Sequence, residues 1–181
     1  ASTGADRFLG VSPDLSPPMP QGFDLRHHQS DQLTGFSASV FFDRAQSKYV
    51  LSIRGTAGLV DIFEDVNRIG LQGYAGDQAV SLYRYYRKLT TPAGQPVSYS
   101  DPEIELLNSL RQGLPIRLHF SAPIAPLLRS SLARDVGELP LDGSAASVIP
   151  TGAPLVVTGH SLGGHLALLF VFSQSILFQT E

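Results

Sequence analysis

The amino-acid sequence predicts an α/β fold with a mostly parallel sheet, flanking helices and an N-terminal hairpin. The main observation is an apolar, β-branched stretch, residues 154–158, that runs into a turn rich in glycine and serine. The residues after that turn, 162–178, are apolar enough for a buried helix. Two other helical patterns and a pair of short alternating segments come earlier in the chain. Strands that alternate with helices are typical of an α/β domain.

Residues 35–54 predict the hairpin. Apolar side chains of the first segment alternate with smaller or polar neighbours: Phe36, Ala38, Val40 and Phe42. A polar cluster at 43–47 predicts a turn, and residues 49–54 return as the second strand. We expect Gly35 to begin the folded part, since the prolines within residues 1–34 indicate an extended arm.

Two helices are predicted between the hairpin and the apolar strand. The first begins near Gly76, with Asp77 placed to cap it, and continues to about Thr90. The second begins with Asp101 as N-cap and Pro102 at the first helical position.

The region between this second helix and the apolar strand is less regular. Residues 114–120 could form a strand. Residues 121–153 mix proline, serine, glycine and alanine around one amphipathic stretch, 127–136. We therefore expect residues 121–153 to be a surface insertion in a domain that spans 35–181.

Composition excludes several classes of function. The 181 residues include 43% hydrophobic residues, which suffices for a core, and the net charge of −3 disfavours nucleic-acid binding. The absence of cysteine excludes disulfides, a thiol nucleophile and a cysteine-based metal site. No metal-ligand spacing is visible, and we expect no metal or organic cofactor. No apolar run is long enough to span a membrane, and no signal peptide is evident.

The turn after the apolar strand carries the strongest motif. It matches the pattern G-x-S-x-G with Gly159, His160, Ser161, Leu162 and Gly163. A strand that turns sharply into a helix holds the central serine in a strained conformation, and the two glycines relieve the crowding. We expect the Ser161 hydroxyl to stand above the edge of the sheet, at the positive end of a helix dipole that suits a developing oxyanion.

A second motif lies about a hundred residues upstream: an apolar strand ends in Arg54, Gly55 and Thr56, and Asp61 and Asp65 follow. With both motifs, the chain resembles the lipase class 3 branch of the α/β-hydrolases and their bacterial secreted relatives. The resemblance covers roughly residues 35–172 and corresponds to the N-terminal portion of such an enzyme. It implies a partial or minimal α/β-hydrolase, exported from the cell.

The resemblance also implies roles for individual residues. Ser161 would be the nucleophile of a lipase or carboxylesterase, and the backbone N–H groups of Thr56 and Leu162 would hold the oxyanion. Arg54 and Asp65 would be structural, and residues 57–67 lie where the family carries its lid. The substrate would be an acyl ester or lipid, at a lipid–water interface; a phospholipase is an alternative. A further alternative is a non-catalytic domain of the same fold that binds an apolar ligand or partner.

The general base and the acid of the catalytic triad are missing from their usual places. Only 20 residues follow Ser161, and among them the single histidine is His165 and the single acid is Glu181. Three explanations remain open: a chain that lacks the expected C-terminal half, a second chain that supplies the rest, or a site that uses an upstream histidine and acid.

The other histidines offer little help. His160 is expected to pack under the turn, and His165 is a weak candidate for the base. His27, His28 and His119 are expected to be solvated surface residues.

The last helix predicts an interface. Residues 166–178 are apolar nearly all round, and a helix of this kind is normally buried on every side. The strand 155–158 would form an exposed sheet edge beside it. We therefore expect self-association, or a complementing chain, through this C-terminal segment.

Overall fold

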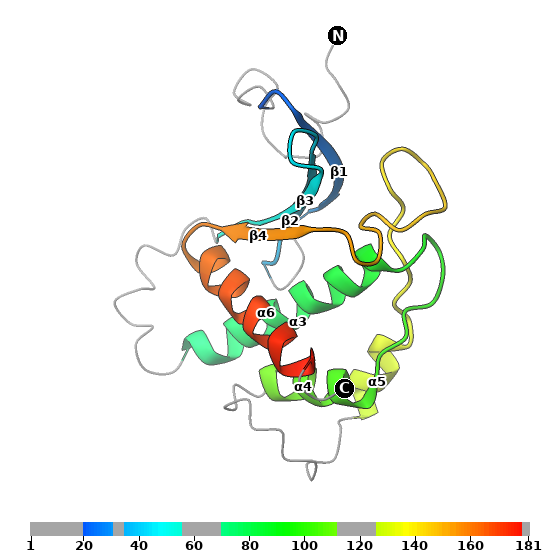
Figure 1. Cartoon of the computed structure of the whole chain (residues 1–181). Coiled ribbons are helices and arrows are strands. Elements are labelled where there is room, and N and C mark those ends of the chain that lie inside the picture. Colours follow the sequence, from blue (N-terminus) through cyan, green and yellow to red (C-terminus); the bar gives the residue numbers. More distant parts are fainter. Residues whose placement is uncertain (1–19, 31–34, 56–69, 112–125, 179–181) are drawn as a thin grey trace.

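A four-stranded sheet with helices against one of its faces makes up the described part of the chain (Figure 1). The structure is a computed structural model, and it describes residues 20–30, 35–55, 70–111 and 126–178. The strands are β1 (Phe23–Gln29), β2 (Ala38–Asp43), β3 (Lys48–Ile53) and β4 (Leu155–Gly159). The helices are α3 (Gly70–Thr90), α4 (Asp101–Arg111), α5 (Pro126–Leu132) and α6 (Leu162–Phe178).

The sheet is mixed, and the expectation of a mostly parallel sheet is wrong for the described strands. Its order is β1-β2-β3-β4; β1 pairs with β2 and β2 with β3 in antiparallel orientation, and only β3 and β4 are parallel. The hairpin explains part of this result. The Asp43 carboxylate accepts hydrogen bonds from the N–H groups of Ala45 and Gln46, which closes a tight turn, and tight turns join antiparallel strands.

Strand β1 lies in the segment that the sequence predicted as an arm. Residues 23–29 pair with β2 along their length, so the folded part begins before Gly35. The ladder contains a register shift between Leu25 and His27. Because such a bulge interrupts the two-residue alternation, and because 26–29 are all polar, the sequence carries little strand signal here.

Helix α3 begins before the predicted start, at Gly70 rather than Gly76, and Asp77 lies inside it. Gly76 has a different role. A Cβ at this position would lie 2.4 Å from the carbonyl oxygen of Leu110, so the glycine permits the close approach of α3 to α4.

Helix α4 forms where the sequence predicts it, with a different cap. The Ser100 hydroxyl accepts a hydrogen bond from the Glu103 N–H (3.4 Å), and the Glu103 carboxylate accepts one from the Ser100 N–H (2.7 Å). Ser100 and Glu103 thus form a capping box, and the N-cap is Ser100 instead of Asp101.

The segment that follows contributes to the core in its described part. Leu128 and Leu132 of α5 are buried, as are Val148 and Ile149 in the loop before β4. The Ile149 N–H donates to the carbonyl of Leu89 at 3.0 Å, which attaches this loop to the end of α3. The predicted strand at 114–120 lies outside the described residues.

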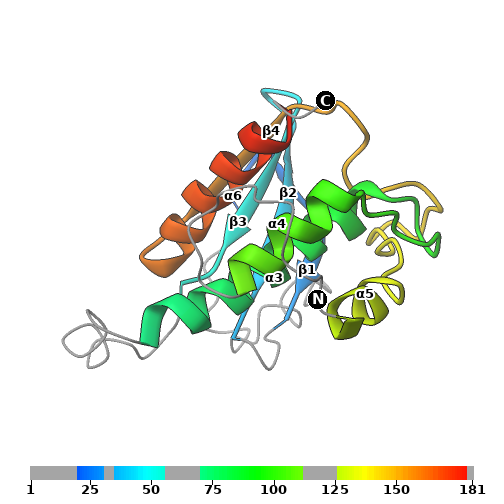
Figure 2. The same cartoon turned by 90° about the horizontal axis from the view of Figure 1, so that it is seen from below.

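The core lies between the sheet and α3, α4 and α6, which Figure 2 shows from the helical side. Its largest fully buried apolar side chains come from both layers: Phe36, Val40, Leu51, Ile53, Leu82, Leu89, Leu106, Leu107, Ile149 and Leu166. Within the described part of the chain, all of these helices pack on this one face. The parallel sheets of α/β proteins normally carry helices on both.

Helix α6 has the predicted bounds, and one of its sides is exposed. Leu162, Leu166 and Phe170 are buried against the core, as expected. The opposite side of the helix is exposed, with Leu168, Val171 and Phe172 at 69%, 54% and 57% exposure. The sequence predicts that a second copy or a complementing chain covers the rest of this apolar helix, and that interface stays a prediction. Over the described ranges, no helix is both long and apolar enough to span a membrane.

Candidate active site around Ser161

Ser161 lies between the last residue of β4 and the first residue of α6, as the motif predicts. Its backbone has a φ of +55°, in the left-handed region that residues other than glycine rarely adopt. The residue is exposed. A serine held in this conformation at a strand-to-helix turn has the geometry of a nucleophile elbow.

The glycines of the motif are required by contacts with the backbone. A Cβ at Gly159 would lie 2.4 Å from the carbonyl group of Gly163, and one at Gly163 would lie 2.4 Å from the carbonyl oxygen of Ile53. A side chain at either position would therefore push the turn away from β3 or α6.

Gly55 is a further glycine of the site. A Cβ there would lie 2.5 Å from the carbonyl oxygen of His160 and 3.5 Å from the Cβ of Ser161. The chain after β3 thus passes directly against the elbow. The sequence places Gly55 in the Arg-Gly-Thr motif but does not predict this contact. A glycine at the end of a strand can indicate that another backbone approaches closely, and this was the one local sign of it.

One of the two residues expected to hold an oxyanion, Leu162, belongs to the described part of the chain. Leu162 is the first residue of α6, where backbone N–H groups have no partner within the helix, and its side chain is buried. The next N–H groups are used: those of Gly164 and His165 donate to the Ser161 carbonyl, and that of Gly163 donates to His160. Thr56, the other expected donor, lies outside the described residues, as do Asp61, Asp65 and the predicted lid.

Both neighbouring histidines are exposed. His160 does not pack under the turn as expected. His165 is one helical turn after Ser161 and also exposed, and its backbone N–H donates to the Ser161 carbonyl at 3.2 Å. Among the described residues, no side chain hydrogen-bonds to the Ser161 hydroxyl.

The upstream histidines are not simple surface residues. The His27 ring lies 2.8 Å from the Tyr85 hydroxyl and 3.5 Å from the Glu138 carboxylate, and its side chain is 12% exposed. Lys88 pairs with the other oxygen of Glu138. The Nδ1 of His28 lies 2.9 Å from the Ser39 hydroxyl. The expectation of solvated histidines at 27 and 28 is therefore wrong, while His119 lies outside the described residues.

These groups alter the acid–base properties of Glu138. The hydrogen bond from His27, together with Lys88, lowers the pKa of Glu138 to about 2. Burial raises the pKa of Tyr85 well above its usual value. The cluster connects β1, α3 and the loop at 138, and β1 is the strand farthest from β4 in the described sheet.

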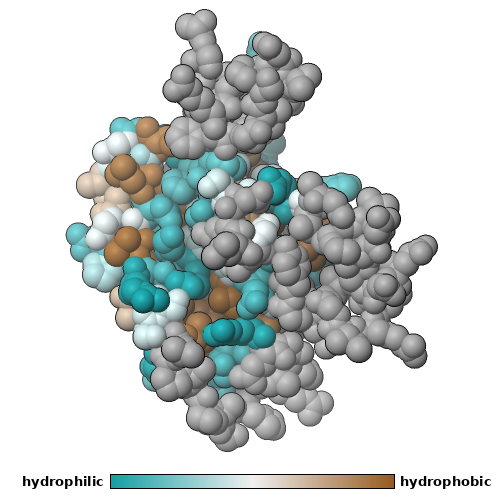
Figure 3. Space-filling model, turned by 180° about the vertical axis from the view of Figure 1, so that it is seen from behind, coloured by the Kyte–Doolittle hydropathy of each residue, from teal (hydrophilic) through white to brown (hydrophobic). Residues whose placement is uncertain are grey.

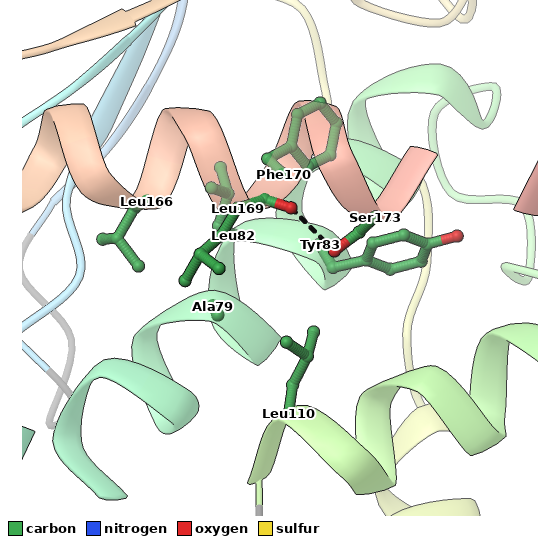
Figure 4. Close-up of a pocket in the computed structure, with 8 residues that line it drawn as sticks. All are labelled: Ala79, Leu82, Tyr83, Leu110, Leu166, Leu169, Phe170 and Ser173. Carbon is green, nitrogen blue, oxygen red and sulfur yellow. Dashed lines mark hydrogen bonds between the residues drawn. The ribbon is translucent and has the colours of Figure 1, made fainter. Parts of the chain in front are cut away.

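One gap in the described interior is too small for an acyl chain. A gap of about 10 Å³ lies between α3, α4 and α6, lined by Leu82, Tyr83, Leu110, Leu166 and Phe170 among others (Figure 4). Such a volume holds at most one water molecule. Ser173, on the wall of this gap, donates to the Leu169 carbonyl of its own helix at 2.7 Å. No group of three or more potential metal ligands occurs within the described ranges.

Comparison with known proteins gives no relative for this chain: no family model, no curated protein and no solved structure matches it.

Proposed function

We propose that this protein is a serine ester hydrolase, a lipase or carboxylesterase that acts on acyl esters of lipid-like substrates. The observation that carries the proposal is the conformation of Ser161, which is exposed at a φ of +55° between β4 and α6. Strained conformations outside glycine are costly and tend to persist where function requires them.

The proposed chemistry follows from this position. The Ser161 hydroxyl attacks the acyl carbonyl, and the tetrahedral oxyanion accepts a hydrogen bond from the Leu162 N–H at the start of α6. The Thr56 N–H is proposed as the second donor, because Gly55 next to it already lies against the elbow. Collapse of the tetrahedral intermediate breaks the bond to the alcohol, which leaves with the proton that the Ser161 hydroxyl lost. Water then hydrolyses the acyl-enzyme to the carboxylic acid and returns a proton to Ser161. The base and acid that this mechanism needs are not assigned to any described residue.

Hydrolysis of a short and a long p-nitrophenyl ester and of a phospholipid tests the proposal, with Ser161→Ala as the inactive variant. Ser175→Ala is a matched control, since Ser175 is an exposed serine on α6 outside the motif. We expect Ser161→Ala to abolish hydrolysis and Ser175→Ala to leave it unchanged. Hydrolysis that survives Ser161→Ala would contradict the nucleophile assignment, and the preferred substrate separates lipase, esterase and phospholipase.

A fluorophosphonate probe tests the nucleophile without a substrate. We expect a covalent mass increase that digestion maps to Ser161. If hydrolysis is observed, replacing His27, His28, His119, His160 and His165 one at a time identifies the base, which is the variant with lost turnover and retained fold.

A non-catalytic domain is the second candidate. It is favoured by the exposed apolar side of α6, and by the finding that no described side chain bonds to the Ser161 hydroxyl. Absence of both hydrolysis and probe labelling, in a protein that is folded by circular dichroism, would support this candidate.

A further inference from the structure

The exposed side of α6 carries three large apolar side chains. Leu168, Val171 and Phe172 follow one another at spacings of three and one residues and so share one side of the helix. We call these three residues the α6 strip. His165 and Ser175, on the same side of the helix, are also exposed. Helix α6 contains no Asp, Glu, Lys or Arg, and all three side chains of the strip are uncharged.

Strand β4 is an edge strand of the sheet that the described residues form. Among the described strands it pairs with β3 on one side and with no strand on the other. The Tyr49 N–H donates to the Pro154 carbonyl at 2.8 Å, so Pro154 and every second residue after it face β3. By this alternation, the N–H and C=O groups of Leu155 and Val157 point to the free edge.

The edge has none of the features that normally prevent pairing. Residues 155–159 contain no charge, no proline and no bulge. Exposed edges are usually protected by such features, because unpaired strands bind other strands.

The α6 strip and the β4 edge lie on the same side of the molecule. Figures 1 and 2 both show β4 and α6 together along this side, with β1 at the far end of the sheet. The view from behind shows a different surface, on which hydrophobic side chains are interspersed with hydrophilic ones (Figure 3).

The size of this surface fits a protein interface. A helix of 17 residues is about 25 Å long, and the helix and sheet layers together are about 20 Å deep. The resulting face is about 500 Å² in projection, which is of the same order as the ~800 Å² that each partner contributes to a standard interface. A second polypeptide strand would pair with the N–H and C=O groups of this edge in a regular ladder, which an acyl chain cannot do.

We infer that this surface binds a second copy of the same chain in a two-fold dimer, with β4 paired to β4 and α6 packed on α6. A two-fold axis brings each feature against itself, so the partner must complement its own surface. Both features do so: a free edge pairs with a free edge, and an uncharged apolar helix packs on its equivalent without like-charge repulsion. Ser161 precedes the strip on α6, so each elbow lies at the border of the interface.

Sedimentation velocity over about 1–100 µM protein tests the inference. We expect a concentration-dependent dimer for the wild type. Leu168→Glu should weaken dimerisation by at least about 100-fold, because it would bury a charge in an apolar contact. Leu139→Glu is the matched control: Leu139 is exposed to a similar extent, 61%, but lies outside α6 and β4, so its dimer should persist.

Amide hydrogen exchange tests the strand pairing separately. In the wild type, the N–H groups of Leu155 and Val157 should exchange more slowly at high protein concentration than at low. In Leu168→Glu, their exchange rates should not depend on protein concentration. A wild type that remains monomeric at 100 µM overturns the inference, including the case in which that monomer binds phosphatidylcholine vesicles through the strip. So does a dimer that Leu139→Glu disrupts and Leu168→Glu does not. Because none of these measurements requires turnover, they are independent of the proposed hydrolase activity.

Discussion

Gly55 and His160 lie in backbone contact: a Cβ on Gly55 would be 2.5 Å from the His160 carbonyl oxygen. Through this contact the end of β3 supports the turn that carries Ser161. Gly163 of α6 makes a similar contact: a Cβ on Gly163 would be 2.4 Å from the carbonyl oxygen of Ile53. The elbow is therefore held between two strands and a helix by approaches that only glycine permits.

Alanine at Gly163 should disturb the elbow. The new methyl group would overlap backbone atoms that cannot rotate away, so we expect Gly163→Ala to lower the free energy of unfolding by about 2–3 kcal/mol and to reduce probe labelling of Ser161. The control is Gly143→Ala, where φ is +73° but no atom lies within 4 Å. Gly143→Ala should lower the free energy of unfolding by only about 1 kcal/mol, because alanine is disfavoured in the left-handed conformation. Probe labelling of Ser161 should stay unchanged. Equal effects of the two substitutions in urea unfolding would contradict the contact.

The strain at Ser161 can be measured with two substitutions. Glycine tolerates a positive φ and alanine does not, so Ser161→Gly should be more stable than Ser161→Ala by about 1 kcal/mol. The same pair at Ser175, inside α6, should show the opposite order by a similar amount, because glycine is a poor helix former. If alanine were the more stable variant at both positions, Ser161 would have an ordinary helical backbone.

Glu138 should make the protein sensitive to acid. Its pKa is lowered from 4.5 to about 2, so its contribution to stability is complete above pH 4.5 and is lost as the pH falls toward 2; the shift corresponds to about 3 kcal/mol. Glu138→Gln should lower the free energy of unfolding at pH 7 by up to this amount. The variant should also lose less stability than the wild type between pH 5 and 2.5, measured by urea unfolding. Asp77→Asn, at an exposed carboxylate of α3, is the control and should behave like the wild type.

Asp135 should be important for the packing of α3. Its carboxylate receives two hydrogen bonds from the Arg84 guanidinium, at 2.8 and 2.6 Å, and one from the Tyr99 hydroxyl at 2.8 Å. Asp135→Ala would leave a partly buried guanidinium without its partner, and we expect a loss of about 3 kcal/mol in thermal or urea unfolding.

The exposed pair of Arg129 and Asp101, 3.2 Å apart, provides the comparison for Asp135. Arg129→Gln should change stability by no more than about 0.5 kcal/mol, because water screens this pair. Losses of the same size from Asp135→Ala and Arg129→Gln would mean that the Asp135 cluster is as weak as a surface ion pair.

Local patterns in the sequence predicted the elements next to the site. The hairpin, the α4 and α6 helices and strand β4 follow from alternation, helical periodicity and turn residues that act within a few positions. The G-x-S-x-G turn predicted where Ser161 lies and why glycines flank it. The sequence does not predict β1, because this strand is largely polar and contains a bulge. It also does not predict the first turns of α3. Gly76 suggests the start of a helix, whereas in the structure it allows α3 to pass close to α4.

By itself, then, the sequence determined the position of Ser161 between a strand and a helix, because that turn depends only on neighbouring residues. The tertiary structure decided the rest of the site's surroundings. It set the mostly antiparallel sheet, the contact of Gly55 with His160, the pairing of His27 with Glu138 and the side of α6 that stays exposed. Each of these features brings together residues that are distant in the chain. Their stability depends on how the sheet and the helices pack, so a pattern of neighbouring residues cannot predict them.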